Sequence, residues 1–146
     1  LQRVRKAQVI IEEGESNKIG QGILVLLGIE MADEMPDVDW LVKKVLNLRI
    51  FGDNNGVMNK SLLDVNGELM IVSQFTLMAS TKKGNRPSYI KAASHEHAIP
   101  LYESFIKKAG SLLESKIVTG TFGAMMRVVL ENDGPVTILI DSKNKE

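Results

Sequence analysis

The apolar run at residues 22–29 constrains the fold of this chain more than any other segment, because it offers no polar face to solvent. A strand that is apolar on both faces must be covered on both sides, so the run predicts a central strand of a sheet. Residues 4–12 also have a strand pattern and end at a turn-rich break at residues 13–17. The two apolar segments therefore predict a hairpin whose second strand is the central one.

Two later segments have the spacing of amphipathic helices. Apolar residues recur every three or four positions at residues 36–48 and 94–113, and Ser94 is suited to cap the start of the second helix. Pro100 lies inside that second pattern, so the helix either kinks there or begins near Ala98. Helices of this kind cover one face of a sheet.

The rest of the pattern is rich in strands. The pair Asn66-Gly67 predicts a hairpin between strands at residues 61–65 and 68–72. Residues 52–56 are read as a turn, since the ligand spacing of a calcium loop is missing. The remaining strands are predicted at 117–122, 125–131 and 136–140. The sequence thus predicts one domain over residues 1–146, of the α/β or, more closely, the α+β class.

Composition excludes several classes of protein. Eighteen basic and eighteen acidic residues cancel, so any nucleic-acid contact must depend on a local patch rather than on a global positive field. The absence of cysteine excludes disulfides and thiolate catalysis. No apolar run approaches the roughly 20 residues of a membrane span. We expect a cytoplasmic protein without membrane contact, and the start at Leu1 suggests that a few N-terminal residues are missing.

Standard catalytic motifs are absent from the sequence. It contains no nucleophile elbow, no Walker loop and no zinc-protease signature. Its two histidines, His95 and His97, are two residues apart at a helix start, where their side chains point to different sides of the axis. We read them as solvated helix residues, and we expect no metal and no cofactor.

The Gly134-Pro135 bond is set in a turn against an apolar segment. Proline lowers the trans preference of its peptide bond to roughly 0.5–1 kcal/mol, and a preceding glycine removes the Cβ clash, so we predict a cis bond here. The simplest interpretation is a turn that leads into a strand. The alternative is a stiff segment that presents main-chain atoms to a ligand, with Asn132 and Val136 beside it.

Polar residues follow the apolar strand at 68–72. In a continued strand Gln74 and Thr76 would share one face, while Ser73 and Phe75 would share the other. These four residues form either an ordinary edge strand or the lining of a site.

A basic loop comes next and carries Lys82, Lys83 and Arg86. It is either a solvated loop or a holder for a single-stranded nucleic-acid end, since three charges are few for wider binding.

Four segments in order carry a resemblance to a known family. They are residues 73–77, 83–88, 121–124 and 132–137, with support from 47–51 and 58–61. Together they resemble the D-aminoacyl-tRNA deacylase family over essentially the whole chain. The pattern departs at Met78 and Ser80, where an aromatic and an acidic residue are expected, and at Met125, where an acidic one is expected. These departures concern loop contacts rather than the central motifs.

The resemblance implies a function and an assembly. It implies hydrolysis of the ester that joins a D-amino acid, or mischarged glycine, to the terminal ribose of tRNA. It implies a compact, barrel-like fold of mixed, largely antiparallel strands, and a homodimer with no other protein partner. In that dimer Gly134 and Pro135 would enter the partner's pocket and reject L-amino acids, and Ser73, Gln74, Phe75 and Thr76 would line the reaction centre.

Two mechanisms remain open at this level. Either Thr76 is the nucleophile, or main-chain donors near Phe75 and Thr76 polarise the ester carbonyl while the neighbouring ribose hydroxyl assists water. We favour the second, because no histidine or amine adjacent in the sequence activates Thr76. The competing functions are a noncatalytic dimeric binder of an RNA 3′ end or a small metabolite, and an esterase without chiral preference.

Overall fold

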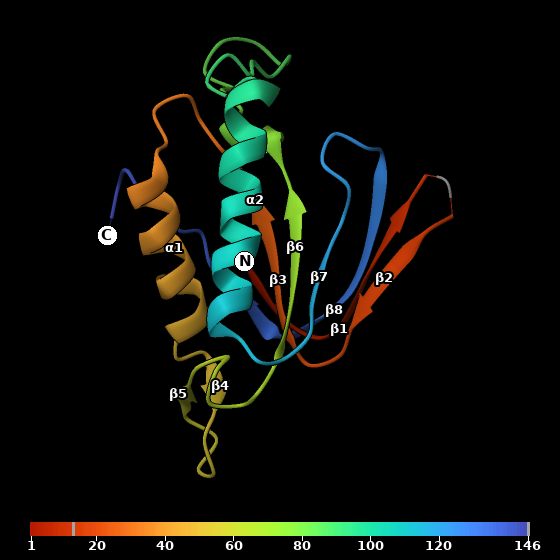
Figure 1. The fold of residues 1–146 in the computed structure, drawn as a ribbon, viewed down its shortest axis with the longest axis vertical. Helices are drawn as coiled ribbons and strands as arrows, with labels where there is room; N and C mark the ends of the chain where they lie inside the picture. Colours follow the sequence, from red (N-terminus) through yellow and green to blue (C-terminus); the bar gives the residue numbers. More distant parts are fainter. Residues whose placement is uncertain (13, 146) are drawn as a thin grey trace.

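The computed structural model describes residues 1–12 and 14–145. Figure 1 shows two helices beside a curved sheet. The strands are β1 (Gln2–Ile11), β2 (Ser16–Ile19), β3 (Gly22–Leu27), β4 (Phe51–Gly52), β5 (Met58–Lys60), β6 (Glu68–Ser73), β7 (Ile117–Thr119) and β8 (Met126–Thr137). The helices are α1 (Met35–Asn47) and α2 (His95–Leu112), and a short 3-10 helix spans Phe75–Met78.

The central position of β3 is confirmed. The main sheet has the order β2-β1-β3-β6-β7, and β8 pairs with β1. β3 lies antiparallel to β1, with Gln2 opposite Leu24, and parallel to β6 on its other edge. The hairpin predicted between residues 4–12 and 22–29 is wrong in one respect. An additional strand, β2, lies between the two in the sequence and pairs with β1, with Ala7 opposite Ile19. β1 is long enough to hold β2 along one half and β3 along the other.

The hairpin predicted at Asn66-Gly67 does not form. Residues 62–66 make turns instead of a strand, and Asp64 accepts a 2.8 Å hydrogen bond from the main chain of Ser61. β6 pairs in parallel with β3 and β7. The physical reason is burial, since residues 69–72 are at most 2% exposed and need neighbours on both edges and both faces.

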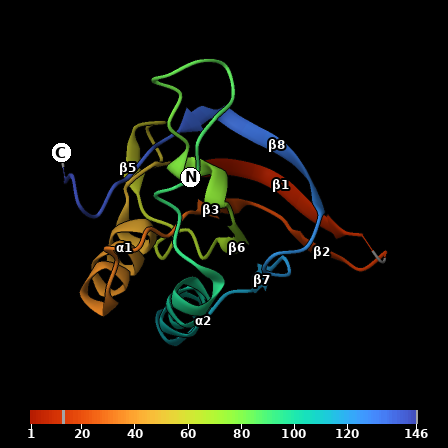
Figure 2. The same ribbon diagram turned by 90° about the horizontal axis from the view of Figure 1, so that it is seen from above.

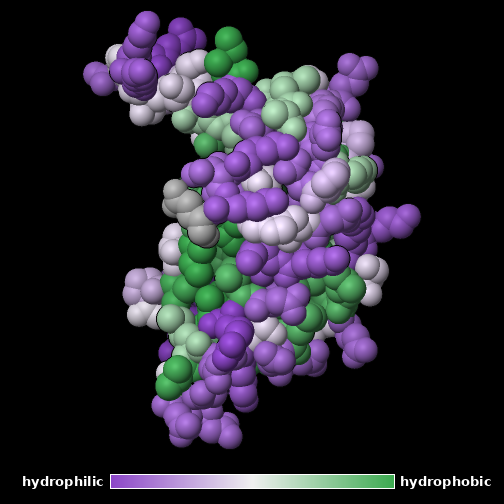
Figure 3. Space-filling model, turned by 90° about the vertical axis from the view of Figure 1, so that its left-hand side faces the viewer, coloured by the Kyte–Doolittle hydropathy of each residue, from purple (hydrophilic) through white to green (hydrophobic). Residues whose placement is uncertain are grey.

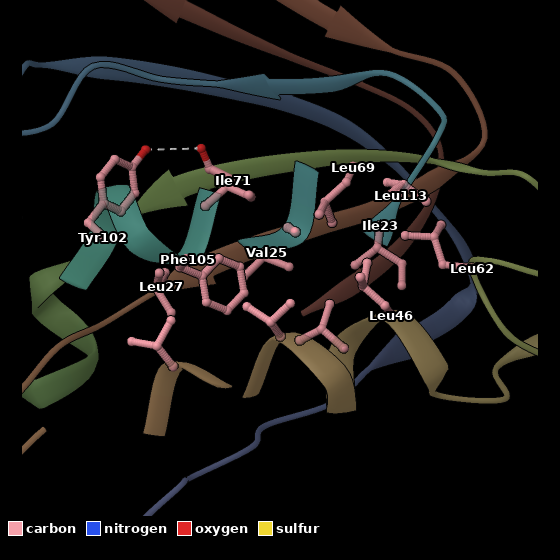
Figure 4. Packing of buried hydrophobic residues seen from close by; sticks show 14 of the residues in the cluster. Ile23, Val25, Leu27, Leu46, Leu62, Leu69, Ile71, Tyr102, Phe105 and Leu113 are labelled. Atoms are coloured by element: carbon pink, nitrogen blue, oxygen red, sulfur yellow. Dashed lines mark hydrogen bonds between the residues drawn. The ribbon is translucent and has the colours of Figure 1, made fainter. Parts of the chain in front are cut away.

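Two apolar clusters lie on the two sides of the sheet. α1 and α2 lie side by side on one side of it, and β1, β2 and β8 curve away on the other (Figure 2). Between the helices and the sheet, Phe105 and Leu46 pack with Val25, Leu69 and Ile71 (Figure 4). The second cluster lines the inside of the curved sheet and includes Val4, Val9, Leu24, Met70 and Val72. The predicted mixed, barrel-like fold with two main helices is therefore confirmed.

Both helices lie close to their predicted positions. Glu34 and Asp37 form a reciprocal capping box at the start of α1. Ser94 caps α2 and accepts a 3.4 Å hydrogen bond from the main-chain N–H of His97. α2 begins at His95 and continues through Pro100, so the alternative start near Ala98 is wrong. No helix in the described parts of the protein has both the length and the apolarity to cross a membrane.

The last strands differ from their predicted limits. One continuous strand, β8, runs from Met126 to Thr137 in place of two separate strands, and the Gly134-Pro135 turn lies inside it, between the paired residues Asn132 and Thr137. Its pairing with β1 has register shifts between Gln2 and Val4 and between Val4 and Lys6. These irregularities let the strand pass the Gly-Pro segment without losing its partner. β7 ends at Thr119, earlier than the predicted residue 122, and residues 53–57 form the predicted turn between β4 and β5.

Candidate functional site

The backbone turns sharply directly after Ser73, the last residue of β6. The main-chain N–H of Gln74 donates a 2.8 Å hydrogen bond to the carbonyl of Leu27, which ties the end of β6 to the end of β3. The next four residues form the 3-10 helix, so the predicted alternation of faces over residues 73–76 is wrong. Instead, the side-chain amide of Gln74 donates a hydrogen bond to the hydroxyl of Thr76.

A cavity of about 400 Å³ opens at this point. Figure 1 shows that the end of β6, the start of α2 and the loop between β7 and β8 come together at one end of the molecule. The lining residues are Leu27, Ile29, Val72, Ser73, Gln74, Phe75, Ala93, His95, Ala98, Phe122, Gly123, Ala124, Met125, Met126 and Val128. Two segments singled out from the sequence, 73–76 and 121–124, thus meet at one site, although Thr76 and Thr121 do not line it.

Three aromatic rings fix the wall of this cavity. Tyr102 lies 5.4 Å from Phe122, and Phe122 lies 5.5 Å from His95 with the planes at 90°. The hydroxyl of Tyr102 donates to the carbonyl of Ile71 at 3.3 Å (Figure 4). Burial raises the pKa of Tyr102 to about 12, so this hydroxyl stays a donor at neutral pH. The contacts among these three rings therefore connect Ile71 of β6 to His95, which lines the cavity.

The two histidines have different environments. His95 lines the cavity, whereas a ring nitrogen of His97 lies 2.9 Å from the carbonyl of Asp33. The prediction that they point to different sides is confirmed, but His97 is a structural residue rather than a purely solvated one. Sequence reasoning missed His95 as a site residue, because only the fold brings the start of α2 beside residues 122–126.

The Gly134-Pro135 bond is cis, as predicted. Gly134 has a φ of +124°, and both residues are exposed. Arg3 donates to the carbonyl of Asp133 at 3.0 Å and is 3.5 Å from its carboxylate. Asn132 accepts a 3.1 Å hydrogen bond from the main-chain N–H of Val136. The turn is thus held from both sides while its tip stays open to solvent.

The Gly-Pro turn does not line this cavity. Met126 and Val128 of β8 do line it, and Gly134 follows six residues after Val128 in the same strand. At about 3.3 Å per residue, that separation is roughly 20 Å along the strand. The two predicted parts of the site are therefore apart within the single chain.

The basic loop is exposed from residue 81 to residue 90. Its base is closed by Ser80 and Ser88, whose main-chain groups exchange hydrogen bonds of 2.8 and 2.9 Å. Tyr89 then packs its ring 5.1 Å from Phe75, a lining residue of the cavity. The loop that carries Lys82, Lys83 and Arg86 lies at the same end of the molecule as the end of β6 and the start of α2 (Figure 1).

A second cavity of about 450 Å³ lies between α1, the end of β3 and residues 137–142. Figure 3 shows the side of the molecule that carries α1, where apolar surface is bordered by hydrophilic side chains. Burial raises the pKa of Asp33, which lines this cavity. None of the predicted site residues lines it, so we place the site in the smaller cavity although this one is larger. Across residues 1–12 and 14–145, no cluster of three or more histidine and carboxylate side chains is arranged to hold a metal ion.

Comparison with known proteins identifies the family. A family model described as D-Tyr-tRNA(Tyr) deacylase matches residues 1–141. The protein belongs to this deacylase family.

Individual members of the deacylase family match the sequence of this protein over its full length. A D-aminoacyl-tRNA deacylase of Cytophaga hutchinsonii is 62% identical over 146 residues, covering 100% of this protein and 97% of the relative. The D-aminoacyl-tRNA deacylase of Azobacteroides pseudotrichonymphae is 60% identical with the same coverage. A solved structure, the c-Myc DNA Unwinding Element Binding Protein, is 43% identical, with a TM-score of 0.88 over 94% of this protein and 93% of that one.

The departures from the deacylase pattern have defined places in the structure. Met125 is 72% exposed at the cavity mouth. Met78 lines the second cavity, and Ser80 forms the base of the basic loop. None of the three interrupts the deacylase segments at 73–76 or 132–137.

Proposed function

We propose that this protein hydrolyses the ester bond of D-aminoacyl-tRNA, and of mischarged glycyl-tRNA, as a proofreading step. The observation that carries the proposal is that residues 73–75 and 122–124, from two of the deacylase segments, line one cavity of about 400 Å³. Family membership over residues 1–141 supports it. Charged tRNA is used by ribosomes, so we place the activity in the cytoplasm.

Chiral selection is assigned to the Gly134-Pro135 turn. An enzyme that accepts many D-amino acids cannot grip their side chains, so it must test the substituents on the α-carbon with rigid groups that do not depend on side-chain identity. Backbone carbonyls of the turn can accept hydrogen bonds from the substrate ammonium, and its bulk can occupy the place that an L side chain needs. Asn132 and Val136 hold the turn through a 3.1 Å hydrogen bond. Glycine has no side chain to exclude and is accepted.

The separation of the turn from the cavity supports a homodimer. Within one protomer the turn and the cavity lie roughly 20 Å apart along β8, so a second copy has to supply the turn. β8 pairs only with β1 among the described strands, and its other edge has no strand beside it. Val129 of this strand is 57% exposed, and Met125, directly before the strand, is 72% exposed. An open, partly apolar edge of this kind favours association with another copy.

A charge placed on β8 tests this dimer. We expect Val129→Asp to shift the protein from dimer to monomer in light scattering at micromolar concentration, and to reduce deacylation in parallel. Val57→Asp is the matched control, because Val57 is 59% exposed in the turn between β4 and β5. A wild-type protein that stays monomeric at these concentrations would contradict the proposed assembly.

The reaction centre is assigned to the start of the 3-10 helix. The first N–H groups of a helical turn have no acceptor inside it, so the main-chain N–H groups of Phe75 and Thr76 can stabilise an oxyanion. One such donor is worth about 10²–10³ in rate. Aminoacyl esters are already activated, and the neighbouring ribose hydroxyl can assist water. The Thr76 hydroxyl accepts from Gln74, and an amide cannot act as its base.

Removal of the Thr76 hydroxyl separates the two mechanisms. We expect Thr76→Ala to keep at least about a tenth of the single-turnover rate, whereas loss of a nucleophile costs on the order of 10⁴-fold or more. Thr76→Ser serves as the control that keeps the hydroxyl. A rate at background for Thr76→Ala, with full activity for Thr76→Ser and unchanged tRNA binding, would assign the nucleophile to Thr76.

The basic loop is assigned to the RNA. Lys82, Lys83 and Arg86 are exposed, and the loop base contacts the cavity through Tyr89 and Phe75. Three cations in this place can hold phosphates next to the acceptor end without attracting duplex RNA in general.

The alternative function is a noncatalytic binder of a nucleic-acid end. The name of one structural relative refers to DNA binding rather than to hydrolysis. We favour the enzyme, because a binder has no need of free main-chain donors at the end of β6. A general esterase is the third possibility, and it differs in cleaving L esters.

A further inference from the structure

His95 carries a role that the sequence pattern did not assign to it. It is the only residue with a titratable side chain among those lining the 400 Å³ cavity. The other lining residues are apolar, apart from Ser73 and the amide of Gln74. A single imidazole in such a lining is placed to make directional contacts with a ligand.

The ring nitrogens of His95 have no protein partner among the described residues, whereas His97 uses a ring nitrogen on the carbonyl of Asp33. The packing of His95 is instead the perpendicular contact with Phe122. Gly123 lies beside the ring, because a Cβ built there would make an ordinary contact of 3.9 Å with Cε1 of His95. The imidazole is therefore oriented by packing while its polar atoms stay available.

The lining chemistry suits a planar base. Nucleobases bind proteins by stacking on aromatic rings and by hydrogen bonds at their edges. Phe122 offers an aromatic ring whose position is fixed by Tyr102, and Met125 and Met126 supply polarisable thioethers. His95 lies perpendicular to Phe122 and adds hydrogen-bonding nitrogens at the same corner.

We propose that His95 is a positioning residue for the terminal nucleoside of the RNA substrate, whose base packs into the corner between Phe122 and the imidazole. This inference rests on the proposed function for its substrate. It assigns His95 to substrate affinity and not to bond cleavage, because the reacting ester belongs at Phe75 and Thr76. A defect at His95 should therefore appear in binding.

Adenosine 5′-monophosphate is the probe for this role, since it reproduces the terminal nucleotide of tRNA and cannot be deacylated. We expect His95→Ala to weaken its Kd about tenfold by calorimetry, as for loss of one stacking or edge contact. His95→Phe keeps a ring and should recover part of the loss. His97→Ala, at the same helix start, should leave the Kd unchanged.

Kinetics on D-tyrosyl-tRNA give the second measurement. His95→Ala should raise KM about tenfold and change kcat less than about twofold. A purely structural role would not separate KM from kcat. An unchanged Kd in His95→Ala, or no binding of the probe to the wild type, would overturn the inference. If the wild type binds the probe through His95 but cleaves no ester, the proposed function fails and the binding role stands.

Discussion

Replacement of Gly134 by alanine should lower kcat/KM for D-tyrosyl-tRNA by about 100-fold or more. Gly134 has a φ of +124°, a conformation that L residues rarely adopt. A Cβ there would lie 2.8 Å from Nη2 of Arg3 and 3.0 Å from Cγ2 of Val136. The Arg3 guanidinium, which holds the neighbouring carbonyl, must therefore move away, and the positive φ strains the turn itself. A displacement near 1 Å at a positioning group costs about 10²-fold in rate.

The matched control for this variant is Gly56→Ala. Gly56 also has a positive φ, of +77°, but nothing lies within 4 Å of its added Cβ. Both variants should lose about 1–2 kcal/mol of stability from backbone strain, and only Gly134→Ala should lose deacylation. Full activity of a folded Gly134→Ala protein would show that the turn has no part in the reaction.

Gly22→Ala should destabilise the fold by about 3 kcal/mol or more. Gly22 begins β3 opposite Glu68 of β6, and an added Cβ would overlap the carbonyl oxygen of Glu68. It would also lie 2.7 Å from the carbonyl carbon and 2.8 Å from the amide nitrogen of that residue. Backbone atoms in a sheet cannot rotate away, so the parallel pairing of β3 and β6 has to open. Both the core and the end of β6 depend on this pairing.

Urea denaturation of Gly20→Ala provides the comparison. At Gly20 the nearest atom to an added Cβ is a carboxylate oxygen of Glu68 at 3.9 Å, an ordinary contact. We expect the midpoint of Gly20→Ala to stay close to that of the wild type and the midpoint of Gly22→Ala to fall sharply. Equal midpoints would contradict the parallel register that places Gly22 of β3 opposite Glu68 of β6.

The elements that the sequence predicted well are those with a strong local signal. The two-faced apolar run at 22–29 became the central β3, and Ser94 became the cap of α2. The parallel pairing of β6 was missed, because Asn66-Gly67 is a strong local signal for a hairpin. The strands that bury β6 are distant from it in the sequence, and the local pattern does not give their direction. β2 was missed for a similar reason, since its exposed residues carry little apolar pattern.

The site was predicted in part. Residues 73–75 do line the cavity, but their arrangement follows a 3-10 helix that alternation could not predict. Leu27, His95 and Met126 come from three other elements, and only the fold brings them together. The cis bond at Gly134-Pro135 was accessible from sequence, because it depends on two adjacent residue types. The distance of this bond from the cavity could not be predicted, because it depends on the length of β8.

The most direct measurement is the incubation of the protein with D-tyrosyl-tRNA and, in parallel, with L-tyrosyl-tRNA. The proposed function predicts rapid loss of the D ester, while the L ester decays at its spontaneous rate. Protection of both esters would indicate a noncatalytic binder, and cleavage of both would indicate an esterase without chiral selection. Either of these results would contradict chiral proofreading by the Gly134-Pro135 turn.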